Sequence, residues 1–231
     1  MAKTKKVLAV VTSASEYRDA GYRTGLWLGE LTHFWDVLTK AGHPVDVVSI
    51  AGGDVPLDPE SLSAPVLAMG GTKKHYQDRS FMDLLDRTRS VRQVRAEDYD
   101  AIYLTGGHGT MFDFADPALQ ELVADFARQD KVVSAVCHGP CGLVEVDVDG
   151  VPLVKGRKVT GFSWTEEKLA GRDDVVPFSL QDRLKERGAK YTKALRPMAE
   201  KVVVDGKLVT GQNPMSATGV GEAVVKLLKK K

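Results

Sequence analysis

The sequence is poor in cysteine, in net charge and in long apolar runs, and each shortage excludes a class of protein. Its two cysteines, Cys137 and Cys141, lie in one short stretch of a 231-residue chain. A disulfide-stabilised secreted protein would spread more cysteines along its length, so we expect a reducing, cytoplasmic location. The 32 Lys and Arg residues nearly balance the 31 Asp and Glu, leaving a net charge of +1. This balance gives no electrostatic reason to expect nucleic acid or an anionic membrane as a partner.

No apolar run approaches the roughly 18 residues of a membrane span. The run at 7–11 follows three lysines but ends after five residues, whereas a secretory signal needs an apolar core of about 7–15. The chain also has no low-complexity linker, no fixed-period repeat and no H-E-x-x-H, Walker or G-x-S-x-G motif. We therefore expect one domain over residues 1–231, with no metal or cofactor motif.

The pattern of apolar residues predicts an α/β sandwich. Four apolar runs are typical of strands buried in a parallel sheet, at 7–12, 44–50, 101–105 and 131–136. Helical spacing predicts helices over 24–41, 117–128, 164–169, 178–187 and 216–229. A further helix is predicted to end near residue 89. Asp-Gly pairs between alternating apolar residues predict antiparallel hairpins at 146–154 and 202–209. Residues 52–76 lack regular periodicity and are interpreted as a cap over the sheet edge.

The segment AVCHGP (135–140) joins the end of a predicted strand to the start of a helix. A cysteine at such a tight turn projects from the carboxyl edge of the sheet, as in a nucleophile elbow. Gly139 lets the turn tighten, and Pro140 suits a first helical turn. The dipole of that helix would lower the pKa of the Cys137 thiol. The alternative is a small buried cysteine that only packs, and the turn by itself favours neither.

A glycine-rich turn, Gly106-Gly107-His108-Gly109, follows the predicted strand at 101–105. Neighbouring parallel strands would place it at the same sheet edge as the cysteine, where glycine amides can donate to a developing oxyanion. A dinucleotide-binding loop is disfavoured, because a G-x-G-x-x-G pattern starting at Gly107 has Phe112 in place of its third glycine. A tight turn without a ligand is the remaining alternative.

Glu30 interrupts the apolar face of the predicted helix at 24–41, with Leu26 and Phe34 four residues to either side. A buried carboxylate either takes a proton or finds a donor, and a raised pKa beside a thiol suits acid–base chemistry. The alternative, which helix geometry alone slightly favours, is a glutamate at the edge of the face that reaches water.

Five motifs in order give the chain a near full-length resemblance to one superfamily. They are TGLWLGE (24–30), TGGHGTMFD (105–113), AVCHGP (135–140), TGFSWTEE (160–167) and LVTGQNPMSA (208–217). With them the chain resembles the PfpI/parkinsonism-associated deglycase superfamily, also called class I glutamine amidotransferase-like. Within it, the chain is most similar to the heat-inducible chaperone and glyoxalase III branch.

The resemblance implies a flavodoxin-like three-layer sandwich with Cys137 as nucleophile, Glu30 as its carboxylate partner and His138 as the third member. Gly107, with Gly106 beside it, and the His138 amide would bind the oxyanion. The branch converts methylglyoxal to lactate without glutathione, cofactor or metal. Here the thiolate would form a hemithioacetal, and Glu30 or His138 would move a proton between the two substrate carbons. Because adjacent side chains at a tight turn often diverge, contact between His138 and the sulfur is not assured.

The resemblance also implies a homodimer whose ligand is a small α-oxoaldehyde, with protein deglycase activity as a second activity to test. A stress-inducible holdase chaperone is the alternative from a different class, and a Cys-dependent peptidase or amidohydrolase is a weaker one. Glutamine hydrolysis is not expected, because the class I triad needs a histidine well downstream of its cysteine. Here the last histidine is His138.

Overall fold

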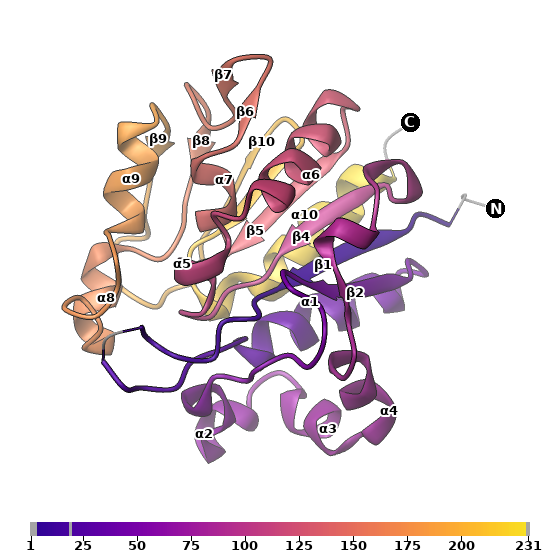
Figure 1. Cartoon of the computed structure of the whole chain (residues 1–231), viewed down its shortest axis with the longest axis vertical. Coiled ribbons are helices and arrows are strands. Elements are labelled where there is room, and N and C mark those ends of the chain that lie inside the picture. Colours follow the sequence, from indigo (N-terminus) through magenta and orange to yellow (C-terminus); the bar gives the residue numbers. More distant parts are fainter. Residues whose placement is uncertain (1–3, 19, 230–231) are drawn as a thin grey trace.

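A seven-stranded, mainly parallel sheet forms the centre of the computed structural model, which describes residues 4–18 and 20–229 (Figure 1). From edge to edge the strands are β10 (Val202–Asp205), β11 (Leu208–Gly211), β5 (Val132–Val136), β4 (Ala101–Leu104), β1 (Val7–Val11), β2 (Val45–Ser49) and β3 (Arg89–Ser90). Only β10 runs antiparallel to its neighbour in this sheet. The carboxyl ends of β4 and β5 therefore lie side by side, as the sequence predicts.

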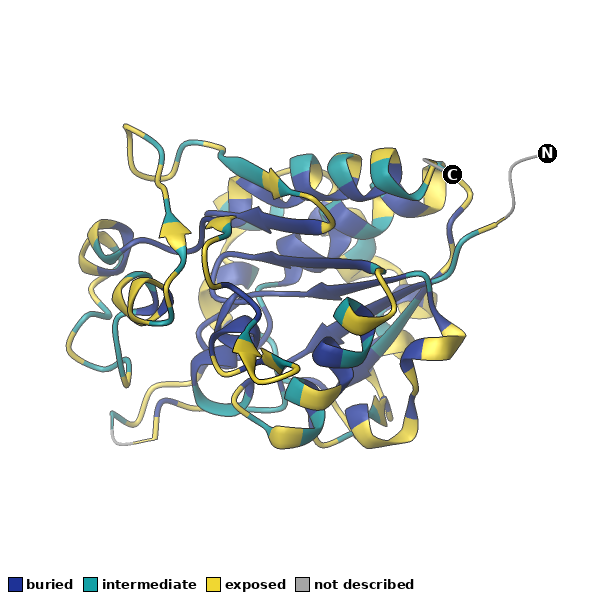
Figure 2. Cartoon of the chain, turned by 90° about the horizontal axis from the view of Figure 1, so that it is seen from above, coloured by how far each residue is buried: buried dark blue, intermediate teal, exposed yellow. Residues whose placement is uncertain are grey.

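Helices cover both faces of the sheet, because alternate residues of each strand point to opposite faces. In β1, Val7, Ala9 and Val11 pack in a core with α1 (Leu28–Lys40) and α10 (Ala217–Leu228). Leu8 and Val10 pack in a second core on the opposite face, with α5 (Thr110–Asp113), α6 (Pro117–Arg128) and α7 (Cys141–Val144). The strands lie buried between these layers (Figure 2). The predicted three-layer, flavodoxin-like architecture is confirmed.

Both predicted hairpins are present. β6 (Asp147–Val148) pairs antiparallel with β7 (Val151–Pro152), and β10 pairs in the same way with β11. In the turn between β6 and β7, Asp149 (φ 52°) and Gly150 (φ 80°) both have left-handed backbone conformations. A two-residue hairpin loop of type I′ requires this conformation at both positions. A second small sheet pairs β8 (Lys158–Val159) with β9 (Lys190–Tyr191). With α8 (Trp164–Ala170) and α9 (Leu180–Glu186), it lies outside the central sheet (Figure 1).

The first helix begins at Leu28, and the prediction that it begins at Thr24 is wrong. Leu26 instead forms a parallel bridge with Leu57, and its amide donates to Pro56 O at 2.8 Å. This pairing holds the backbone before the helix extended, which helical periodicity cannot reveal. It also leaves Trp27 outside the helix, as its N-cap.

The segment between β2 and β3 contains short helices, and the prediction of a helix ending near residue 89 is wrong. The helices are α2 (Ala64–Leu67), α3 (Thr72–Gln77) and α4 (Arg79–Met82), with 3-10 turns at Pro59–Leu62 and Asp83–Leu85. Asp78 breaks the run because its backbone is extended and its side chain caps α4, accepting from the Ser80 amide at 2.9 Å. The interpretation of residues 52–76 as a cap stays a prediction.

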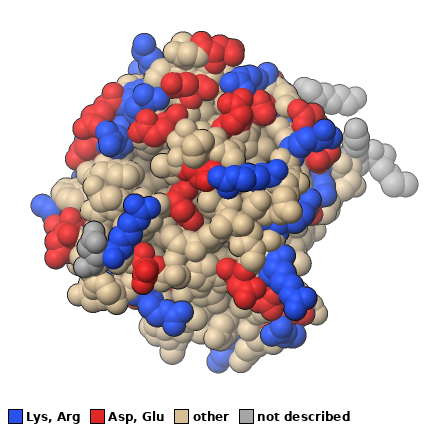
Figure 3. All heavy atoms as spheres, in the orientation of Figure 1, with Lys and Arg blue, Asp and Glu red and all other residues tan. Residues whose placement is uncertain are grey.

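Acidic and basic side chains are intermingled on the face shown in Figure 3, in keeping with the near-zero net charge. Within the described part of the chain, no helix has the length and apolarity required to cross a bilayer.

Candidate active site

Cys137 lies at a sharp turn directly after β5, as predicted. Its φ is +59°, a left-handed conformation that is strained for a non-glycine residue and is found at functional turns. Its amide donates to Gly211 O at 3.0 Å, which ties the turn to β11. A Cβ on Gly139 would lie 2.3 Å from Leu104 O, so only glycine allows the turn to close against β4.

The predicted lowering of the thiol pKa by a helix dipole is wrong. The helix after the turn, α7, has only four residues and begins four positions beyond Cys137. Burial raises the pKa of the Cys137 thiol well above its usual range, and the neighbouring Glu30 carboxylate raises it further. Burial in a folded core is not a local property, so the elbow motif does not reveal it. A neighbouring base must therefore take the proton of this thiol.

Glu30 is fully buried in the first turn of α1, so the alternative that it reaches water is wrong. Its Oε2 accepts from the Gly106 amide at 2.7 Å, and Oε1 has no hydrogen-bond partner among the described residues. Burial raises the pKa of Glu30 to about 8, opposed by hydrogen bonding to Cys137 and Gly106. A Cβ on Gly106 would lie 2.4 Å from Oε2 and 2.8 Å from Cys137 Cβ, so carboxyl and thiol flank this glycine. The carboxyl of Glu30 thus keeps its proton to a higher pH than an ordinary glutamate does.

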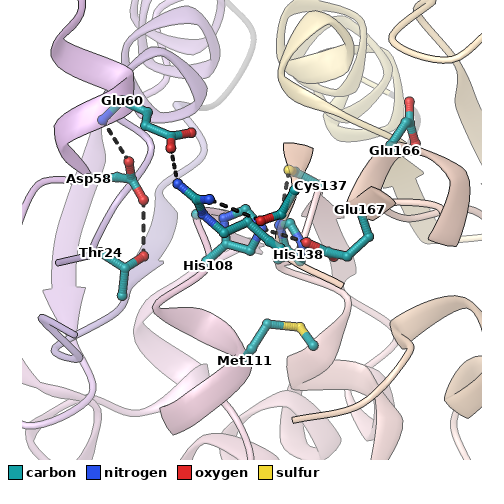
Figure 4. A network of polar contacts seen from close by, with 12 residues as sticks. Thr24, Asp58, Glu60, His108, Met111, Cys137, His138, Glu166 and Glu167 are labelled. Carbon is teal, nitrogen blue, oxygen red and sulfur yellow. Dashed lines mark hydrogen bonds and ion pairs between the residues drawn. The ribbon is translucent and has the colours of Figure 1, made fainter. Parts of the chain in front are cut away.

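His138 contacts the sulfur after all. Its Nδ1 lies 3.4 Å from Cys137 Sγ, and its Nε2 lies 2.8 Å from Glu167 Oε2 (Figure 4). A second histidine, His108, places its Nε2 2.7 Å from Glu167 Oε1. An ionised carboxylate only accepts hydrogen bonds, so both Nε2 atoms carry hydrogen. When the His138 ring is neutral, its Nδ1 therefore presents a lone pair to the thiol, which is the geometry of a general base.

The roles of Glu167 and His108 were not predicted from the sequence. Burial alone would raise the pKa of Glu167, but the charge of His138 and hydrogen bonds from His108 and His138 hold that pKa well below its usual range. Burial and the nearby His138 charge lower the pKa of His108, which favours one positive charge in the cluster over two. The one local signal is a capping box, in which Ser163 and Glu166 start α8 and bring Glu167 into its first turn.

His108, His138 and Glu167 could also be considered as metal ligands, because one ligand atom of each lies within 4.8 Å of the others. The same atoms already form two short hydrogen bonds to one carboxylate. The Nε2 atoms of both histidines and both oxygens of Glu167 are therefore already engaged with one another. This arrangement fits a proton relay and does not require an ion.

Two backbone amides beside Cys137 are available for an oxyanion. The N–H groups of Gly107 and His138 have no acceptor among the described residues. The Gly106 amide is not available, because it donates to Glu30; this corrects its assignment as an oxyanion donor.

A cavity that opens to solvent, with about 620 Å³ of empty space including its mouth, reaches Cys137, His108, His138 and Gly107. Its remaining walls are mainly apolar side chains. They come from the N-cap of α1, the 3-10 turn at Pro59–Leu62, Phe162, α8, the 192–201 loop and Pro214. Cys141 does not line this cavity: it is buried, with its Sγ 3.0 Å from Met111 Sδ.

These features define an α/β protein with a Cys–His–Glu site at the carboxyl edge of a flavodoxin-like sheet. The chain belongs to the DJ-1/PfpI family, whose model matches residues 25–227. It is 34% identical over 236 residues to the glutathione-independent glyoxalase HSP31 of Saccharomyces cerevisiae, covering 97% of this chain and 98% of the relative. It is 32% identical to glyoxalase 3 of Candida albicans, covering 95% and 97%.

Solved structures agree with this placement. Rapid Encystment Protein 24 kDa of Francisella tularensis superposes with a TM-score of 0.93 at 39% identity, covering 98% of this chain and all of that one. Glyoxalase III of Candida albicans superposes with a TM-score of 0.89 at 30% identity, covering 96% and 97%.

Proposed function

We propose that this protein is a glutathione-independent glyoxalase that converts methylglyoxal and related small α-oxoaldehydes to 2-hydroxy acids. The observation that carries the proposal is the 3.4 Å contact between the Cys137 sulfur and His138 Nδ1, with Glu167 bound to the other nitrogen of the ring. Relatives that match nearly the whole chain at 32–34% identity are named as glyoxalases of this kind.

In the first step His138 takes the Cys137 proton and the sulfur adds to the aldehyde carbon. The former carbonyl oxygen becomes an oxyanion that the amides of Gly107 and His138 stabilise, and it takes up a proton to give the hemithioacetal. Glu167 stabilises the imidazolium that forms, as the acid member of a triad does. The substrate is neutral, so no further charge has to be buried.

In the second step the hydroxyl proton of the hemithioacetal passes to the neighbouring ketone oxygen, and a proton moves from the former aldehyde carbon to the carbon of that ketone. The products are a thioester and a new hydroxyl group. We assign this transfer to Glu30, because its pKa of about 8 suits both accepting and donating a proton near neutral pH. Its Oε1 has no partner among the described residues, whereas His138 is already engaged by Cys137 and Glu167. Water then cleaves the thioester, releases lactate and restores the thiol, with no redox cofactor consumed.

The test is the loss of methylglyoxal and the gain of lactate without glutathione. Cys137→Ala should abolish turnover, and Cys141→Ala, the matched cysteine outside the cavity, should retain it. An inactive wild-type protein, or full activity in Cys137→Ala, would contradict the proposal. Suppression of aggregation, measured in the same variants, tests the holdase alternative, since chaperoning should survive loss of Cys137.

Deglycase activity, a cytoplasmic location and a homodimer stay predictions, as do the peptidase and amidohydrolase alternatives. Light scattering on the purified protein measures the oligomeric state.

A further inference from the structure

Met198 occupies an unusual position at the mouth of the Cys137 cavity. Its φ is +61°, in the left-handed region that side chains other than glycine rarely adopt. Its side chain lines the cavity although the residue is 44% exposed. It lies in the 192–201 segment, which forms neither helix nor strand. Strain in an irregular segment persists only when the surrounding structure fixes it.

The Met198 amide donates to Glu166 Oε1 at 2.8 Å, and Glu166 is fully buried. The same carboxylate accepts from the Ser163 amide and hydroxyl at 2.9 and 2.7 Å, and from Gln212 Nε2 and Asn213 Nδ2 at 2.9 Å each. Five donors therefore reach the two oxygens of Glu166, which makes it a buried anchor for the segments that carry them. It joins α8, the strained loop and the segment after β11.

Gln212 and Asn213 hold the loop at further points. Gln212 Oε1 accepts from the Ala194 amide at 2.6 Å, and Asn213 Nδ2 donates to Ala199 O at 2.8 Å. The loop is thus fixed by buried side chains from other segments. These side chains belong to the TGFSWTEE and LVTGQNPMSA motifs but take no part in the proposed reaction. Such a network places Met198 independently of the loop's own conformational preference.

The cavity that Met198 faces suits an uncharged, apolar group. Its apolar walls are Trp27, Phe162, Leu169, Ala170, Met198 and Pro214. Two carboxylates, Glu60 and Glu166, also line it, and no Lys or Arg does so among the described residues. Glu60 is paired with Arg172 and Glu166 with its five donors, so neither offers a group to an anion. An anionic aldehyde would therefore find no Lys or Arg on the cavity wall to pair with, whereas an apolar substituent would be removed from water.

We propose that Met198 is a specificity-determining residue, held by Glu166 as its positioning residue, and that it selects α-oxoaldehydes with a neutral, apolar substituent over anionic ones. The thioether forms one wall of the space that receives the substituent on the second carbonyl carbon. This assignment rests on the proposed glyoxalase function for its substrate. The geometry of the cavity can be tested without turnover.

The test alkylates Cys137 with three iodoacetyl probes and quantifies the modified peptide by mass spectrometry. Iodoacetamide is small and neutral, iodoacetate is of similar size but anionic, and iodoacetanilide carries an apolar ring. In each case the sulfur displaces iodide, and the rates are normalised to those with free glutathione. The wild-type protein should react fastest with iodoacetanilide and slowest with iodoacetate.

Met198→Ala should lower the ratio of the iodoacetanilide rate to the iodoacetamide rate about fivefold. The reason is that the apolar ring loses roughly half of the stabilisation that burial against a full methionine side chain provides. Met198→Gly should lower it equally, since the side chain and not the strain forms the wall. Glu166→Gln should lower it too, because one of its five donors would face an amide N–H. Met215→Ala, a methionine of similar exposure (46%) that does not line the cavity, should leave the ratio unchanged.

An unchanged ratio in Met198→Ala overturns the assignment, as does an equal change in Met215→Ala or a wild-type protein that alkylates equally fast with iodoacetate and iodoacetamide. Steady-state kcat/KM for phenylglyoxal, methylglyoxal and glyoxylate completes the test, with the same order expected. If the probe ratios shift but methylglyoxal is not turned over, the glyoxalase proposal fails and the assignment of Met198 stands. If methylglyoxal is turned over but the probe ratios do not shift, the glyoxalase proposal stands and the assignment of Met198 fails.

Discussion

The buried carboxyl of Glu30 should make the protein less stable as the pH rises, and Glu30→Gln should remove this dependence. The pKa of Glu30 is about 8 in the folded protein against an ordinary value of 4.5. The folded state therefore holds a proton that the unfolded chain releases between these two values. The stabilisation from this proton is fully present below pH 4.5 and is lost as the pH rises through 8.

The magnitude follows from the difference in pKa. Each pH unit in this window lowers the free energy of unfolding by ~1.4 kcal/mol, so the wild-type protein loses ~3 kcal/mol by pH 7 and ~5 kcal/mol by pH 8 and above. Glutamine has no proton to lose, and its carbonyl can still accept from the Gly106 amide. Relative to the wild-type protein, Glu30→Gln should thus gain stability with pH while losing turnover.

Urea denaturation of both proteins at pH 5, 6, 7, 8 and 9 measures this. Other groups with shifted pKa values, such as Asp113 with a pKa of about 6, are present in both proteins and cancel in the difference. The difference in unfolding free energy should be small at pH 5, rise through pH 8 and then level off. A difference that stays flat from pH 5 to 8 would refute the argument that the carboxyl is buried and unpaired.

Two further predictions concern the same site. Glu167→Gln keeps the shape of the relay but removes the charge that stabilises the His138 imidazolium. We therefore expect kcat/KM for methylglyoxal to fall by a factor of about 10²–10⁴ at pH 7. Near wild-type activity in this variant would rule out the relay. Gly106→Ala forces a Cβ between Glu30 and Cys137 and should abolish turnover and lower the melting temperature. Gly29→Ala in α1, where a Cβ would meet its nearest atom at an ordinary 3.4 Å, should be tolerated, and equal damage in both variants would count against the close approach at Gly106.

The sequence allowed the central sheet, the hairpins and the turn at Cys137 to be predicted, because these depend on local patterns. Strands buried on both faces are continuous apolar runs, and the cysteine follows one of them directly. The approach of Glu30 to this turn was expected only from the resemblance, because helix geometry alone slightly favoured a glutamate that reaches water. The start of α1 was predicted wrongly because Leu26 pairs with Leu57, 31 positions along the chain, and periodicity carries no trace of that partner.

Glu167 was not predicted because its role depends on where α8 packs. The capping box fixes the start of the helix, yet nothing in it indicates that the next residue faces His138, which comes from the turn after β5. The thiol pKa was predicted in the wrong direction for a related reason. The motif indicates a turn, whereas burial depends on every segment that covers it.

The pairing of β11 with β5 affects how the protein is made. The strand that carries the nucleophile has as its neighbour a strand ending at Gly211, and the loop around Met198 is anchored by residues 212 and 213. A chain emerging from the ribosome therefore cannot complete the cavity until residues 212–214 have been synthesised. A shorter nascent chain carries the thiol without its enclosure, so the reactive centre is assembled about 75 residues after its nucleophile has been made.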